Sequence, residues 1–309
     1  MWIGNVKNDV MKLYVLGNGF DMAHGLNTSY YAFEEYVKEY HKEWHKLIGA
    51  MYRENDPSWL WKDYERNLSN VDIAGMTEEY NCRWLCMEKH EIENFFDNIY
   101  DRLQALFHEW VLSIDMRYCN NTMELSSRDY YINFNYTNVL ETVYGIPRRQ
   151  ICYIHNDTRN QVALRPIVGH GDTFKQVETR VMNHKNDIRR IVEKEGCPKW
   201  CQDENDYVCF LMKCFQQLLG SLKKLPDDII RYNQDYLDKL SRLPIDEVYV
   251  LGHSLSRVDN AYFKKLFEFE AIKNANWHVS YHSLKEWPIL YVSFIRLSGY
   301  RKLPQMMKM

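Results

Sequence analysis

The sequence predicts an α/β fold with a Rossmann-like, mostly parallel sheet flanked by helices. Short apolar runs alternate with longer stretches of helical periodicity, which is typical of parallel strands joined by crossover helices. The first apolar run, at 13–16, leads into a turn containing Gly17 and Gly19 before a helical pattern begins. This order of strand, glycine turn and helix is typical of the opening of nucleotide-binding α/β domains.

The apolar periodicity places the other elements in order along the chain. Strands are expected at 13–16, 130–134, 151–154, 165–168, 248–251, 277–281 and 289–294. Helices are expected at 30–53, 58–68, 90–116, 176–192, 203–222, 227–243 and 260–272. We interpret the segments at about 30–118 and 176–243 as helical insertions into one domain that spans residues 1–309.

Composition excludes several function classes. Of the 309 residues, 46% are hydrophobic and 26% are charged, which fits a globular chain with a substantial core. The net charge of −3 gives no overall attraction to nucleic acid or an anionic membrane. No apolar run approaches a membrane span, and the N-terminus does not resemble a secretory signal. We therefore expect a cytoplasmic location. The sequence leaves the formation of a homo-oligomer open.

The cysteine and histidine spacings argue against a metal site. The eight cysteines are expected to be reduced. The two C-x3-C pairs, at 82/86 and 197/201, differ from the C-x2-C spacing of structural zinc sites. His41 and His45 have the spacing of a metalloprotease pair, but the glutamate does not follow the first histidine. No metal is predicted.

Polar segments follow four predicted strands, at 17–21, 133–137, 154–155 and 252–255. Open α/β sheets bind ligands outside the carboxyl ends of their strands, so these segments are expected to meet. The candidate ligand-binding residues are Gly17, Asn18, Gly19, Phe20, Asp21, His24, Gly25, Tyr136, Thr137, Gly252, His253, Ser254 and Asp259. An alternative for Asp259 is that it caps the helix that follows it.

Several motifs resemble the bacteriophage abortive infection AbiH family. They are Gly17-Asn18-Gly19-Phe20-Asp21-x-Ala23-His24-Gly25-Leu26, Trp61-x-Asp63, Phe134-Asn135-Tyr136-Thr137 and Leu251-Gly252-His253-Ser254-Leu255. The resemblance implies a prokaryotic anti-phage protein and names no reaction. The partners it suggests are a phage-derived trigger or another defence protein.

A more distant similarity is to sirtuin-like NAD-consuming defence domains. Its motifs are the glycine turn, Asn135-Tyr136-Thr137, the strand that ends at His155, and Gly252-His253-Ser254-Leu255. The resemblance implies NAD or a related nucleotide as the ligand. The chain departs from that pattern at Asp21, where those domains have serine, at Thr137, where they have aspartate, and at Asn156, where they have glycine. The zinc-binding cysteine pairs of protein deacetylases are also missing, so peptide deacetylation is not expected.

The implied chemistry is hydrolysis of the bond between nicotinamide and ribose. Its transition state carries positive charge on the ribose, so it needs an oriented nucleophile and stabilising polar groups. Asn135 would hold a water molecule or the ribose hydroxyls. His155 would accept a proton, because imidazole titrates near neutral pH. His170, which precedes Gly171, is the other candidate for this histidine.

Other functions remain open. Gly252-His253-Ser254-Leu255-Ser256 resembles the nucleophile elbow of serine hydrolases, with Ser254 as nucleophile and His278 or His282 as base. A non-catalytic nucleotide sensor or interaction protein is a second alternative. A nucleic-acid-cleaving toxin would need a basic stripe, and the chain has only isolated basic pairs such as Arg148-Arg149.

Overall fold

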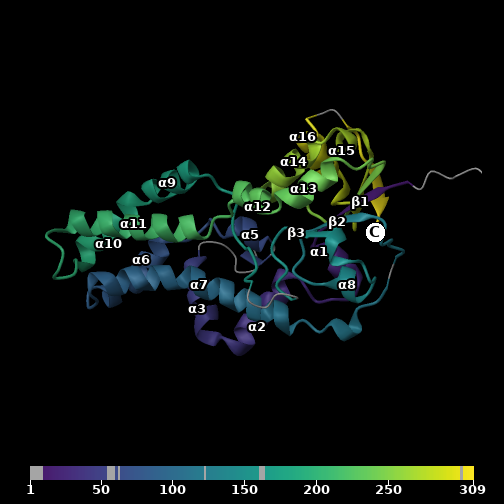
Figure 1. Cartoon of the computed structure of the whole chain (residues 1–309). Helices are drawn as coiled ribbons and strands as arrows, with labels where there is room; N and C mark the ends of the chain where they lie inside the picture. The colour runs from purple at the N-terminus through teal and green to yellow at the C-terminus, as the bar shows by residue number, and fades with distance from the viewer. Residues whose placement is uncertain (1–9, 54–59, 62, 122, 160–163, 300–301) are drawn as a thin grey trace, which may run out of the picture. The chain divides into compact units, whose positions relative to one another are not determined.

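The chain forms two compact units. The computed structural model describes residues 10–53, 60–61, 63–121, 123–159, 164–299 and 302–309 (Figure 1). The sheet unit contains 1–28, 114–164 and 225–309, and the helical unit contains 29–113 and 165–224. Residues 225–243, which we expected within a helical insertion, belong to the sheet unit. Each unit is described by itself below.

The described part of the sheet unit holds one six-stranded, wholly parallel sheet, which confirms the predicted fold class. The strand order is β3-β2-β1-β4-β5-β6. The strands are β1 (Lys12–Leu16), β2 (Tyr130–Asn133), β3 (Ile151–Tyr153), β4 (Glu247–Leu251), β5 (Asn276–Tyr281) and β6 (Gln305–Lys308). This is the order of a doubly wound dinucleotide-binding fold, and its topological switch point lies between β1 and β4.

An aromatic ladder crosses the sheet. Tyr14 on β1 is in register with Tyr131 on β2 and Tyr249 on β4, and Tyr249 is in register with His278 on β5. Successive rings stack with centroids 5.2, 5.3 and 4.4 Å apart. Parallel sheets bury both faces, so cross-strand ring pairs of this kind add to the packing that holds the strands in register.

The described helices of the sheet unit lie between its strands along the chain. They are α1 (Asn18–Ala23), η1 (Met116–Tyr118), α8 (Val139–Thr142), η2 (Arg148–Gln150), α12 (Pro226–Tyr232), α13 (Gln234–Ser241), η3 (Arg257–Asp259), α14 (Asn260–Phe267), α15 (Glu270–Asn274) and α16 (Trp287–Leu297). The core between sheet and helices includes Phe20, Leu26, Leu140 and Ile146. Because α1 begins directly after β1, the start of this helix lies at the carboxyl edge of the sheet.

Two predicted strands are wrong, and one strand was not predicted. Residues 165–168 form no strand, and Pro166 lacks the N–H that a ladder needs. Residues 289–294 lie in helix α16, where Leu290, Phe294 and Leu297 bury one face. The run of β-branched and aromatic residues suggested a strand, but the helical spacing of these three side chains decides the packing. Strand β6 carries no alternating apolar signal.

The helical unit is built around aromatic side chains. Its described helices are α2 (Tyr30–Tyr40), α3 (Lys42–Met51), α5 (Tyr64–Asn67), α6 (Ile73–Trp84), α7 (Lys89–Ser113), α9 (Phe174–Asn183), α10 (Lys185–Glu195) and α11 (Glu204–Ser221). Phe33 is fully buried and contacts the rings of Trp61, Tyr64, Phe107 and Trp110. Much of the chain's aromatic content therefore forms core.

Several predicted helices are divided in the structure. The helix expected at 30–53 breaks at His41, the one at 176–192 breaks at His184, and the one at 227–243 breaks at Asn233. The helix expected at 260–272 becomes α14 and α15. A one-residue break preserves the apolar period on both sides, so periodicity does not reveal it. Of the helix expected at 58–68, residues 58, 59 and 62 lie outside the described residues, and α6 was not predicted.

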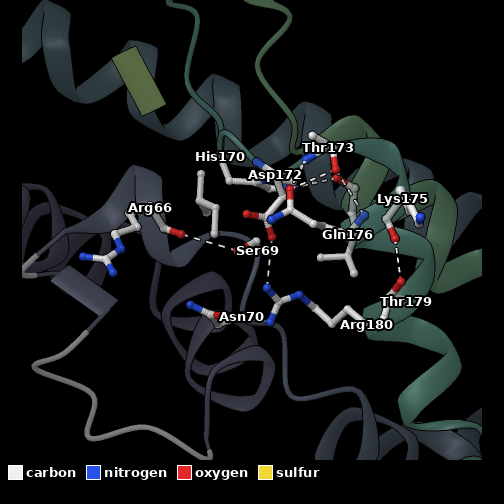
Figure 2. A network of polar contacts seen from close by, with 12 residues as sticks. Arg66, Ser69, Asn70, His170, Asp172, Thr173, Lys175, Gln176, Thr179 and Arg180 are labelled. Carbon is white, nitrogen blue, oxygen red and sulfur yellow. Dashed lines mark hydrogen bonds and ion pairs between the residues drawn. The ribbon is translucent and has the colours of Figure 1, made fainter. Parts of the chain in front are cut away.

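Helix α9 begins with a capping box that can be tested directly (Figure 2). Thr173 Oγ1 accepts from Gln176 N–H, and Gln176 Oε1 accepts from Thr173 N–H. We expect Thr173→Ala to lower the free energy of unfolding by about 1 kcal/mol because it removes this cap. Thr179→Ala in the same helix is the control. Equal losses of stability in urea titrations of the two variants would contradict the prediction.

Candidate functional site

The four polar segments lie side by side at the carboxyl edge of the sheet. Backbone hydrogen bonds connect them: Gly17 N–H to Leu251 O (3.0 Å), Gly19 N–H to Gly252 O (2.8 Å), Phe134 N–H to Leu16 O (2.9 Å) and Ile154 N–H to Asn133 O (3.0 Å). The order β3-β2-β1-β4 makes these strand ends neighbours. The segments that carry the candidate residues of the sheet unit therefore share one edge.

The glycines at this edge allow two loops to touch. A Cβ on Gly17 would lie 2.5 Å from His253 Cα, and one on Gly19 would lie 2.8 Å from Gly252 Cα. Gly252 has φ +62°, and a Cβ there would lie 2.1 Å from Phe20 N. The space beside these glycines is thus occupied by the backbone of the facing loop at the β1–β4 switch point. A role for Gly17 and Gly19 in ligand approach stays a prediction.

Four other candidates in the first loop have structural roles within the sheet unit. Asn18 Nδ2 donates to Thr28 O at 2.9 Å. The buried His24 donates from Nδ1 to Phe20 O at 2.7 Å and contacts the Tyr144 hydroxyl through Nε2. Burial lowers the pKa of His24, which favours the neutral form of its ring. Phe20 is part of the core, and Gly25 has φ +84°.

Asp21 joins the loop after β1 to the segment after β2. Its side chain is buried, and it accepts hydrogen bonds from Asn135 Nδ2 (2.8 Å) and Thr137 Oγ1 (2.6 Å). Burial raises the pKa of Asp21 to about 7, although both hydrogen bonds and the charge of Arg159 act to lower it. Both carboxylate oxygens are therefore engaged by protein groups in the resting arrangement.

Arg159 is a site residue that sequence reasoning missed. Its charge favours the ionised form of Asp21, and its Nη1 donates to Ile114 O at 3.0 Å. Burial lowers the pKa of Arg159, and Asp21 opposes that effect. A buried carboxylate predicts a nearby cation, and Arg159 follows the strand next to the one that supplies Asn135. A search of the sequence for a cation near the predicted strand ends could therefore have identified Arg159.

His155 lies beneath an aromatic ring at the end of β3. Its Nδ1 donates to Phe134 O at 3.0 Å, because a carbonyl oxygen can only accept. Its Nε2 faces Asp259 Oδ1 at 3.9 Å. The ring of Tyr136 stacks on the imidazole with centroids 5.4 Å apart. The segment after β2 therefore contacts Asp21 through two side chains and His155 through Phe134 and Tyr136.

His253 and Asp259 belong to the same group of buried side chains. His253 Nδ1 accepts from Leu255 N–H at 2.9 Å, so the proton of the neutral ring lies on Nε2. That nitrogen is 3.6 Å from Asp259 Oδ2. Asp259 stands at the N-cap of α14, but its side chain makes no capping hydrogen bond. The helix-cap interpretation of Asp259 is wrong, because its carboxylate lies between two imidazoles.

Two histidines and a carboxylate could in principle bind a metal. The described residues contain no group of three or more His, Cys, Asp or Glu side chains arranged to hold one. The tautomer of His253 also disfavours metal binding at this position. Its Nε2, the nitrogen that faces Asp259, carries the ring proton and so has no lone pair for a metal. The arrangement suits proton transfer better than metal coordination.

Ser254 is exposed and has no hydrogen bond to a histidine within the described ranges. His278 is in register with Tyr249, two residues before the end of β4, and therefore does not reach the loop that carries Ser254. His282 is exposed after β5. This geometry does not assemble the nucleophile and base of a serine hydrolase.

His170 lies in the helical unit (Figure 2). Its Nε2 donates to Leu219 O at 2.9 Å, and its Nδ1 accepts from Asp172 N–H at 3.2 Å. Backbone groups thus engage both ring nitrogens, and burial lowers the pKa of His170. Between the two candidate histidines, these contacts favour His155 for proton transfer.

A parallel sheet wound in this order, with polar loops gathered at its carboxyl edge, defines a Rossmann-like α/β protein. Within that class, the chain belongs to the bacteriophage abortive infection AbiH family, whose sequence model matches residues 13–281. This match supports a role in phage abortive infection and spans all four polar loops. No curated protein and no solved structure matches the chain. Within the described ranges, no helix has both the length and the apolar character required to cross a membrane.

Proposed function

We propose that the sheet unit binds a nucleotide such as NAD at its carboxyl edge and hydrolyses the bond between nicotinamide and ribose. The observation that carries this proposal is the segment after β2, because it contacts both a buried carboxyl group and a buried histidine. Asn135 and Thr137 bind Asp21, while Phe134 and Tyr136 contact His155. The strand order adds support, since folds of this order bind dinucleotides at this edge.

Each group has a defined task in this reaction. The C1′–N bond to nicotinamide breaks, and the oxygen of a water molecule bonds to C1′. The proton of that water moves to Nε2 of His155, which does not carry the tautomeric proton. Asn135 uses Nδ2 to bind Asp21, and this bond orients its amide oxygen for water or a ribose hydroxyl. Asp21, when ionised, adds negative potential that favours the positive transition state.

Replacing His155 tests this proposal. We expect purified protein to release nicotinamide from NAD, and His155→Ala to reduce the rate at least about 100-fold because the proton acceptor is gone. The matched control is His282→Ala, which removes an exposed imidazole of the same unit. Nicotinamide is measured by chromatography, and thermal unfolding checks that both variants fold. Release that is equal in the two variants, or absent from the wild type, contradicts the proposal.

Several polar side chains of the site are hydrogen-bonded to other protein groups. This favours a second candidate function, a sensor that binds a nucleotide without hydrolysing it. Asn18 and both oxygens of Asp21 bind protein groups, and only 4% of the His155 side chain is exposed. A closed site of this kind fits a protein that opens to recognise a ligand and signals to a partner. Calorimetric binding of ADP-ribose or NAD without nicotinamide release supports the sensor. If neither ligand binds, both candidates fail.

A further inference from the structure

Asp259 faces two histidines in one buried cluster of the sheet unit. Its Oδ1 is 3.9 Å from His155 Nε2, and its Oδ2 is 3.6 Å from His253 Nε2. The two imidazole side chains are each 4% exposed, and the Asp259 side chain is 9% exposed. Little water screens charges at this depth, so a proton on either ring interacts strongly with the carboxylate.

The backbone contacts determine where the protons lie. Leu255 N–H donates to His253 Nδ1, so the proton of the neutral His253 ring lies on Nε2. His253 therefore presents an N–H to Asp259. Phe134 O accepts from His155 Nδ1, so neutral His155 presents a lone pair to the same carboxylate. A lone pair opposite a carboxylate oxygen is unfavourable. A proton on His155 Nε2 converts this contact into an attractive ion pair.

We propose that Asp259 is a positioning residue that orients His253 through its Nε2–H and stabilises the protonated form of His155. This gives Asp259 and His253 a task other than direct ligand binding. The catalytic use of the cluster rests on the proposed function, in which the proton that a water molecule loses on bonding to C1′ moves to His155 Nε2. Besides Asp259 and His253, the titratable groups near the His155 imidazole include, among the described residues, Tyr136 and Tyr262, with ring centroids 5.4 and 6.5 Å away.

The first test titrates His155 in the full-length chain by long-range proton–nitrogen NMR. We expect Asp259→Asn to lower the pKa of His155 by about 1 to 3 pH units, because the facing negative charge is removed and burial then dominates. The nitrogen shifts should also show His253 protonated on Nε2 and neutral His155 protonated on Nδ1. Asparagine keeps the shape of the side chain and still presents an oxygen to His253 Nε2–H.

Asp157→Asn is the matched control. Asp157 is a buried carboxylate two residues from His155, but it accepts from Arg148 Nε at 2.8 Å. Its replacement should move the pKa of His155 much less. Equal shifts in the two variants, or His253 protonated on Nδ1, overturn the proposal.

A second readout separates this proposal from the proposed function. In the rate of nicotinamide release against pH, the acid limb should move down with the pKa of His155 in Asp259→Asn. If the wild type releases no nicotinamide but the NMR shift is present, the NAD reaction fails and the role of Asp259 stands. If nicotinamide is released but neither the pKa nor the acid limb moves, the role of Asp259 fails and the reaction stands.

Discussion

Gly252→Ala is expected to lower the free energy of unfolding by about 3 kcal/mol or more, because two costs act at this position. The residue has φ +62°, where an alanine is strained by about 1–2 kcal/mol. The new Cβ would also lie 2.1 Å from Phe20 N, and that atom belongs to backbone that cannot rotate away. The loops after β1 and β4 would have to separate.

Gly145→Ala is the control for this prediction. Gly145 has a similar φ of +65°, but a Cβ there meets no atom within 4 Å. It should therefore show only the backbone strain, about 1–2 kcal/mol. Urea unfolding of the two variants isolates the steric part of the effect. Similar losses in both would mean that the loops at the switch point are not packed as closely as described.

Asp21 should make the stability of the protein depend on pH. Its pKa is about 7 in the folded state, against an ordinary value of 3.8. The folded state therefore holds this proton more tightly than the unfolded chain. The stabilisation is complete below about pH 4 and is lost as the pH rises through about 7. The pKa difference corresponds to about 4 kcal/mol across that window.

Asp21→Asn should remove this pH dependence. Asparagine can accept from Asn135 Nδ2 through its oxygen and donate to Thr137 Oγ1, so both contacts survive without a titrating group. We expect the free energy of unfolding of the variant to vary much less between pH 4 and 8 than that of the wild type. Asp235→Asn, which changes an exposed carboxylate of the same unit, should retain the wild-type slope. A wild-type stability that does not fall over this range would contradict the folded-state pKa.

Local patterns predicted the strands that build the site. The strands that end near Leu16, Asn133, Tyr153 and Leu251 each carry a short apolar run, and all four form. They are buried on both faces, so almost every residue in them is apolar. The same criterion failed at 289–294, because a helix packed by Leu290, Phe294 and Leu297 is equally apolar over a short window.

Sequence motifs typical of ligand binding or helix capping did not predict which groups their residues contact in the fold. Gly17 and Gly19 have the spacing of a nucleotide-binding turn, but the facing loop approaches them directly. Asp259 occupies an N-cap position, but its carboxylate turns toward two histidines. In both cases the partner comes from a distant part of the chain, so local spacing could not identify it.

By itself, the sequence determined the parallel α/β class, the membership in the AbiH family and the placement of polar segments after the strands. These properties follow from residues close together along the chain, through apolar periodicity and local motifs. Only the tertiary structure decided that Asp21 binds Asn135 and Thr137, 114 and 116 residues away, and that Asp259 joins His155 to His253. Such contacts depend on strand order and helix packing, which bring together side chains with no local relation to each other.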